Sequence, residues 1–237
     1  MARRYQDFPY WTSFISREHM KNIQVNKLFK AFDKLQYIHG DKNLFSVYGA
    51  GCINHPKVFL LFMNPTGRNV SCDKKRVWIR APRLWTKNIW KLLTALWMIS
   101  KKTFEQIQKL KPQERTEIFS LEVYQELANN NVYISNLAKC TQTDARPLKD
   151  NVFKEYLDLI YQEISCVQPQ YIISFGNQVS SILLDQKITV SGYTKDKHEI
   201  LTINKQTYQV YPSFYPVGQG MRNMPQAIER ILHILKY

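Results

Sequence analysis

The sequence predicts an α/β protein, a three-layer α/β/α sandwich on a mainly parallel central sheet of about four strands. Short apolar runs of strand length alternate along the chain with segments that have the apolar spacing of helices. The 237 residues are 44% hydrophobic, which is enough to bury a full core. No repeat or Gly/Ser-rich linker divides them. We therefore expect one domain over residues 1–237, including a helical N-terminal region of about 1–45.

The predicted elements follow one another in a regular order. The strands, each a short apolar run, are expected within 57–63, 131–140, 170–176 and 207–213, the last joined in a hairpin to 199–203. The helices, each with amphipathic or buried spacing, are expected at about 17–38, 89–99, 152–164, 177–184 and 225–237. Strands that alternate with helices in this way predict a parallel sheet covered on both faces.

Cysteine use and hydropathy exclude several classes of protein. The four cysteines form no C-x-x-C pair, which favours reduced thiols over a metal site or a disulfide framework. No window has the length of a membrane span or the order of a signal peptide, so we expect a cytoplasmic protein that binds no membrane. A nucleotide-binding enzyme of Rossmann type is disfavoured, because the lone "GAG" at 49–51 precedes the first strand. We expect no metal and no cofactor.

The charge balance points to nucleic acid as the partner. Lys and Arg outnumber Asp and Glu by 33 to 19, and a formal net charge of +14 attracts polyanions. Between residues 68 and 91 a single acid, Asp73, stands among basic residues interleaved with Trp78, Trp85 and Trp90. Cations neutralise phosphates and flat rings stack on unpaired bases, so this run suits a strand with an exposed base. The alternative is a solvated face above core tryptophans, which we expect for Trp90.

Three predicted strands end in polar residues. Asn64 follows the first strand, Asn136 ends the second, and the loop of 215–222 follows the last. Because the carboxyl ends of parallel strands meet at one edge of a sheet, these residues are expected to line one pocket there. By spacing alone, Asn64 is equally compatible with an Asx turn before Pro65, and Asn136 with a cap after its strand.

The order of these segments resembles the uracil-DNA glycosylase superfamily. "YGAGCINHPKVFLLFMNPTG" is similar to the first motif of its single-strand-selective and mismatch-specific branches, and "TKNIWKLL" to the helix that follows in the mismatch branch. "VYISNLAKC" and "QPQYIISFGNQVSSILL" resemble two segments of the iron-sulfur branch, and "YPVGQGMRN" occupies the place of the His-Pro-Ser motif. The early cysteine pair of the iron-sulfur branch is missing, so no cluster is expected.

The resemblance implies a role for each matching residue. Asn64 would position the water that attacks the sugar, and Asn136 would read the Watson–Crick edge of a flipped base. Tyr215 replaces the usual His, so its phenol would donate to the base oxygen. The residues expected to hold the base or the water are Met63, Pro65, Thr66 and Gly67, with Trp85 as the stacking ring and Trp78 second. The residues expected to contact DNA are Arg68, Lys74, Lys75, Arg76, Arg80, Lys139, Gln219, Arg222 and Asn223.

The resemblance implies a monofunctional DNA glycosylase that acts as a monomer and leaves an abasic site. The acid of the most efficient branch is replaced by Asn64, and no branch fits throughout. This mixture favours an unusual base, a C5-substituted pyrimidine such as the hypermodified ones of some phage genomes, with plain uracil as the alternative. A phage-defence role and a repair role both remain open. The rival hypothesis is a catalytically silent protein of the same fold that only binds DNA.

Overall fold

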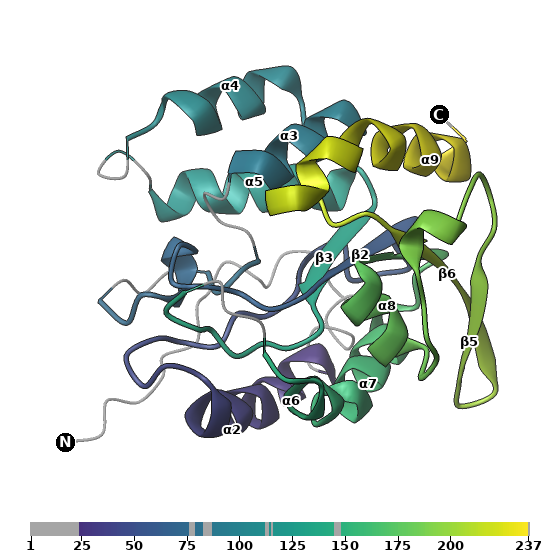
Figure 1. The fold of residues 1–237 in the computed structure, drawn as a ribbon. Coiled ribbons are helices and arrows are strands. Elements are labelled where there is room, and N and C mark those ends of the chain that lie inside the picture. Colours follow the sequence, from purple (N-terminus) through teal and green to yellow (C-terminus); the bar gives the residue numbers. More distant parts are fainter. Residues whose placement is uncertain are drawn as a thin grey trace.

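The fold is a six-stranded sheet between two layers of helices (Figure 1). The computed structural model describes residues 24–75, 79–82, 87–111, 114, 116–144 and 148–236. The strands, in the spatial order β1-β3-β2-β4-β6-β5, are β1 (Ala50–Gly51), β3 (Val132–Asn136), β2 (Val58–Phe62), β4 (Tyr171–Phe175), β6 (Gln206–Ser213) and β5 (Glu199–Ile203). The four central strands are parallel, as predicted, and antiparallel β1 and β5 add one strand at each edge.

The helices divide between the two faces of the sheet (Figure 1). One face carries α3 (Lys87–Ala95), α4 (Lys101–Lys109), α5 (Glu117–Asn129) and α9 (Met224–Leu235). The other carries α2 (Phe29–His39), α6 (Asp150–Lys154), α7 (Leu157–Val167) and α8 (Asn177–Leu183). Short 3-10 turns are η2 (Val70–Cys72), η4 (Val190–Gly192) and η5 (Gly218–Asn223). The three-layer prediction is confirmed, whereas α4 and α5 were not predicted and the helix expected at 152–164 is divided into α6 and α7.

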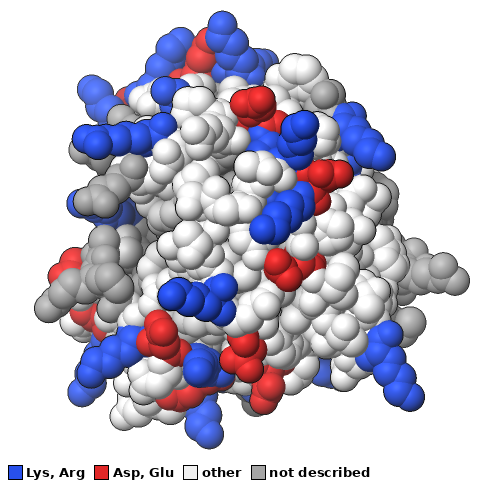
Figure 2. Space-filling model, turned by 45° about the vertical axis from the view of Figure 1, so that its right-hand side comes forward, with Lys and Arg blue, Asp and Glu red and all other residues white. Residues whose placement is uncertain are grey.

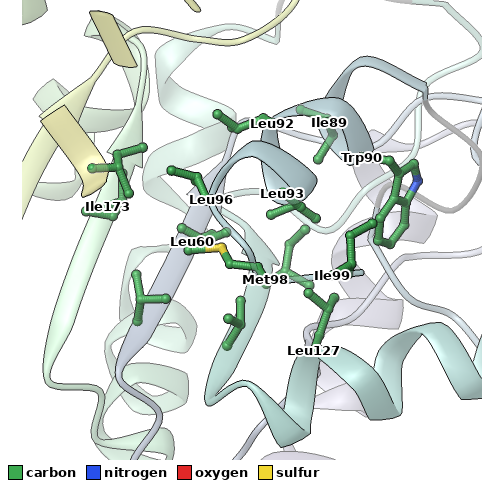
Figure 3. Packing of buried hydrophobic residues seen from close by; sticks show 14 of the residues in the cluster. Leu60, Ile89, Trp90, Leu92, Leu93, Leu96, Met98, Ile99, Leu127 and Ile173 are labelled. Atoms are coloured by element: carbon green, nitrogen blue, oxygen red, sulfur yellow. The ribbon is translucent and has the colours of Figure 1, made fainter. Parts of the chain in front are cut away.

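Strand β2 joins the two hydrophobic cores. All five of its residues are buried. Because side chains alternate across a strand, Leu60 and Phe62 pack with α3, α5 and α9, whereas Phe59 and Leu61 pack with α2, α6, α7 and α8. Figure 3 shows Leu60 among side chains of the α3 layer, and Trp90 lies at one side of this cluster. Trp90 is a core residue, as expected, and lies edge-on to Tyr124.

None of the helices in the described ranges combines the length and apolar character needed to cross a bilayer.

A buried ion pair lies beneath β3 on the α2 side. Lys139 and Glu163 are both 0% exposed, and Lys139 Nζ lies 2.7 Å from Glu163 Oε2. Glu163 also accepts hydrogen bonds from the hydroxyls of Tyr133 (2.8 Å) and Ser135 (3.0 Å). Lys139 Nζ donates to the Asn136 carbonyl at 2.8 Å. Burial lowers the pKa of Lys139, and the Glu163 carboxylate opposes that shift. This burial contradicts the expectation that Lys139 contacts DNA.

Replacing Lys139 tests this internal role. Lys139→Met leaves the Glu163 carboxylate buried and unpaired, so we expect a loss of about 3–5 kcal/mol in the free energy of unfolding. Lys139→Met/Glu163→Gln, which buries no charge, should recover part of that loss. Chemical denaturation measures both. Equal stability of Lys139→Met and the wild type would contradict the buried ion pair.

Candidate active site

The carboxyl ends of the four parallel strands bring four side chains into one row, which we call the strand-end row. Asn136 of β3 pairs in register with Phe62 of β2, and Phe175 of β4 pairs with Ser213 of β6. The rings of Phe62 and Phe175 stack, with centroids 4.5 Å apart and planes 12° apart. By strand alternation all four side chains lie on the α3 face of the sheet. The row is thus an aromatic pair with one polar side chain at each end.

The Asn136 side chain is buried without a partner. Asn136 is 0% exposed, and neither Nδ2 nor Oδ1 makes a hydrogen bond within the described chain. Ser213, 2% exposed, has an unpartnered Oγ as well. A buried polar group left unsatisfied costs about 1–3 kcal/mol. The alternative role of Asn136 as a cap has no hydrogen bond to support it, whereas a ligand that donates and accepts would satisfy both amide atoms.

Asn64 lies two residues beyond Phe62, in a loop of residues 63–67 that we call the Asn64 loop. The residue is 7% exposed, and its Nδ2 donates to the Pro65 carbonyl at 3.1 Å. Within the described chain this is the one hydrogen bond of the Asn64 side chain, so Oδ1 can accept one from a water. An Asx turn would instead use Oδ1 as the acceptor of a backbone amide.

The segment after β3 fixes the Asn64 loop. Leu137 N donates to Phe62 O at 2.7 Å, and Ala138 N donates to Met63 O at 3.0 Å. Farther along, Thr66 forms a parallel bridge with Gln142, and Gly67 N donates to Gln142 O at 2.7 Å. The amide of Gly67 is therefore already used within the protein and is not free to hold a base or a water.

Tyr215 lies beside the strand-end row. Its ring is half-buried and meets Phe62 edge-on, with centroids 6.2 Å apart. Gly176, at φ 92°, follows β4 and donates its amide to Ser213 O at 2.8 Å. A Cβ on Gly220 would lie 1.7 Å from Tyr215 O, so only glycine permits η5 to approach so closely. The structure thus brings Asn64, Asn136 and Tyr215 to one edge of the sheet, as the sequence predicts.

Arg80 is paired inside the protein. Its guanidinium lies 2.9 Å from the Asp33 carboxylate and 4.2 Å from the centroid of the Tyr48 ring. Its side chain is 19% exposed. These contacts tie Arg80 to α2, contrary to the expectation that it contacts DNA.

The other residues expected to contact DNA divide into three groups. Exposed side chains belong to Arg68, Lys74, Lys75 and Arg222, and Asn223 is half-exposed. Arg76 and the side chain of Gln219 lie outside what the structure describes, as do Trp85 and Trp78, the two candidates for the ring that stacks on the base. On the face seen in Figure 2, Lys and Arg side chains stand among Asp and Glu side chains, so this face is not uniformly basic. Among the described residues, no three His, Cys, Asp or Glu side chains are grouped to hold a metal.

Three members of the strand-end row, Phe62, Phe175 and Ser213, were missed in the sequence. Phe62 appears there only as part of the apolar run before Asn64. Phe175 appears there only as one residue of an apolar run, and Ser213 as the end of the hairpin strand. Ser213 carries the same signal that singled out Asn136, a polar residue at the carboxyl end of a core strand. Its register with Phe175 could be known only from the pairing of β4 with β6.

Comparison with known proteins agrees with this arrangement. The family model of the uracil DNA glycosylase superfamily matches residues 48–236. No curated protein gives a significant match. The matched range includes the whole sheet, the Asn64 loop and η5, and it begins after α2. The chain therefore belongs to the uracil-DNA glycosylase superfamily.

Proposed function

We propose that the protein is a monofunctional DNA glycosylase that hydrolyses the N-glycosidic bond of a flipped pyrimidine and leaves an abasic site. Membership of the superfamily supports a DNA glycosylase function in general. The observation that carries the proposal is the Asn136 amide, buried and unpartnered at the end of the strand-end row. The base is uracil or a C5-substituted pyrimidine, including the hypermodified pyrimidines of some phage genomes.

Base recognition follows from the chemistry of a carboxamide. Asn136 Oδ1 accepts and Nδ2 donates, which matches the paired donor and acceptor on the Watson–Crick edge of a pyrimidine. The stacked rings of Phe62 and Phe175 place an apolar surface next to this amide. Binding a base would give Asn136 Nδ2 and Oδ1 hydrogen-bond partners and thereby offset the free-energy cost of burying them.

Bond cleavage requires groups that respond to developing charge. Breaking an N-glycosidic bond leaves positive charge on the sugar and negative charge on the departing base. Asn64 Oδ1 would orient the attacking water, and the Tyr215 hydroxyl would donate to the base oxygen. Lys139 follows Asn136 closely in the chain but is paired with Glu163, which disfavours it as a Schiff-base nucleophile and favours a monofunctional reaction.

DNA contact would use exposed cations that adjoin the site residues in the sequence. Arg68, Lys74 and Lys75 follow the Asn64 loop, and Arg222 lies in η5 after Tyr215. Phosphate contacts of this kind repay the few kcal/mol that base flipping costs. Trp85, with Trp78 as the second choice, remains the proposed stacking ring. The proposed enzyme acts as a monomer.

A catalytically silent DNA-binding protein is the second candidate. It is favoured by the Tyr at position 215, where the family has His. Such a protein would bind DNA with the same surface and release no base.

Abasic-site formation separates the two candidates. We expect the wild type to produce alkali-sensitive strand breaks in DNA that holds an excisable pyrimidine. Asn64→Ala should lower the cleavage rate at least about 100-fold with little change in the dissociation constant for DNA, because a water-orienting group acts in the transition state. Lys154→Ala, an exposed change on α6, should leave both quantities unchanged. Equal cleavage by folded wild type and Asn64→Ala would contradict the role of Asn64.

The choice of base depends on the space near C5 of the pyrimidine. In the strict uracil enzymes of the superfamily, a bulky ring next to the first motif blocks that position. Thr66 stands here instead, half-buried and paired with Gln142. A Cβ on Gly67 would lie 3.1 Å from Thr143 O, so this glycine serves a close backbone approach. The proposed room at C5 therefore depends on the small side chain of Thr66.

Competition between bases tests this specificity. In otherwise identical DNA, we expect release of C5-substituted pyrimidines at a rate similar to or above that of uracil. Thr66→Tyr should reduce release of the substituted bases much more than release of uracil, because the added ring occupies the C5 side. Thr202→Tyr, at an exposed position of β5, is the matched control and should change neither. Exclusive release of uracil by the wild type would refute the open C5 side and leave the glycosylase proposal intact.

A further inference from the structure

Helix α2 lies outside the range that matches the superfamily, yet it is bonded to the segment that fixes the Asn64 loop. The match begins at residue 48, whereas α2 covers Phe29–His39. Bonds from α2 and from residues 41–45 reach residues 141–143, more than ninety-five positions along the chain. Hydrogen bonds over such separations are tertiary contacts, so α2 is built into this edge of the sheet.

Gln36 makes the central contacts of this connection. Its side chain is 7% exposed and uses both ends of its carboxamide. Nε2 donates to Asp41 O at 2.9 Å and to Leu44 O at 3.1 Å, while Oε1 accepts from Thr141 N at 2.7 Å. One buried amide thus holds the chain leaving α2 and the segment after β3 at the same time. Three good hydrogen bonds make its orientation unambiguous.

The neighbouring residues leave room for the Gln36 side chain and are hydrogen-bonded to one another around it. A Cβ on Gly40 would lie 2.1 Å from Gln36 Nε2, so only glycine leaves room for the amide to fold back over the end of α2. Asp41 N donates to Thr141 O at 2.9 Å, and Gln142 Nε2 donates to His39 O at 2.6 Å. The end of α2 and residues 141–142 are therefore joined by backbone and side-chain bonds on both sides of Gln36.

Gln142 is in turn hydrogen-bonded directly to the Asn64 loop. Gln142 N donates to Pro65 O at 3.3 Å, and Gly67 N donates to Gln142 O at 2.7 Å. Pro65 O is also the acceptor of the Asn64 side chain at 3.1 Å. The contacts run without a gap from Gln36 through Thr141 and Gln142 to the carbonyl that orients Asn64.

We propose that Gln36 is a positioning residue, which holds residues 141–142 and through them the Asn64 loop in the geometry needed for cleavage. The proposal rests on the proposed function, because it assigns a purpose to the placement of Asn64. A displacement of about 1 Å in a reacting group can lower a rate about 100-fold. Helix α2 is thus an added part of the active-site support that the superfamily match does not include.

A substitution at Gln36, compared with one at Asn130, separates a positioning role from a role in general stability. Gln36→Met keeps the size of the side chain and removes all three hydrogen bonds. Asn130→Leu is a control for position, because Asn130 Nδ2 donates to Met98 O at 3.0 Å near the amino-terminal end of β3, away from the Asn64 loop. We expect Gln36→Met to lower the maximal cleavage rate about 10- to 100-fold with a dissociation constant for DNA within about twofold of wild type. Asn130→Leu should leave the rate unchanged and should cost less stability than Gln36→Met, because Asn130 is exposed.

Gln36→Glu adds a pH dependence that loss of stability alone would not produce. Burial raises the pKa of a carboxyl group, so at low pH this side chain is neutral and can donate to one of the two carbonyls. At higher pH it is ionised and faces carbonyl oxygens. The cleavage rate of Gln36→Glu relative to wild type at the same pH should rise as the pH falls, whereas the ratio for Gln36→Met should stay flat.

Amide hydrogen exchange provides a measurement independent of activity. The amide of Gly67 should exchange faster in Gln36→Met than in the wild type or Asn130→Leu. A wild type without cleavage activity would overturn the proposed function, while faster exchange at Gly67 would still show the coupling. An active wild type with unchanged rate and unchanged Gly67 exchange in Gln36→Met would overturn the inference about Gln36.

Discussion

The parallel backbone pairing of β3, β2, β4 and β6 determines where the four members of the strand-end row lie and where the loops that carry Asn64 and Tyr215 begin. It puts Asn136 beside Phe62 and Phe175 beside Ser213, although these residues are separated by long stretches of chain. A shift of one residue in any pair would turn that strand's side chains to the opposite face. The wholly buried β2, packed on both faces, resists such a shift because it would exchange the contents of two cores. The site geometry is thus a consequence of core packing.

The polar side chains on the two faces of β3 differ in their hydrogen bonding. Toward α2, Tyr133, Ser135 and Lys139 are all bonded to Glu163. Burial and the Glu163 carboxylate raise the pKa of Tyr133, so its phenol stays protonated and donates. Toward α3, the Asn136 amide has no partner within the described chain. A fully bonded network thus fixes the backbone of a residue whose side chain is left unsatisfied, which is the arrangement expected of a preorganised ligand site.

The sequence predicted most of the sheet because each core strand is a short apolar run. It did not predict α4, of which Ile107 is the buried residue, or α5, which buries Val123, Tyr124 and Leu127. Ser100 and Thr116 provide N-caps for these helices that the sequence could have revealed. The positions of the charged residues were harder to predict from the sequence. Lys139 and Arg80 were assigned to DNA because the sequence does not show that their partners are Glu163, 24 positions away, and Asp33, 47 positions away. The contact of Gln36 with Thr141 spans 105 positions and carries no local signal.

The Asn136 amide is where the account can be tested most directly. Selective labelling of asparagine side chains with nitrogen-15, with Asn136→Asp to assign the resonance, would report on this group alone. The ligand is DNA holding a candidate pyrimidine whose glycosidic bond is made resistant to hydrolysis by fluorine on the sugar. If Asn136 reads the base, its side-chain protons should move downfield and exchange more slowly in this complex than with the same DNA lacking that base. An Asn136 resonance that is the same in both saturated complexes would contradict the account.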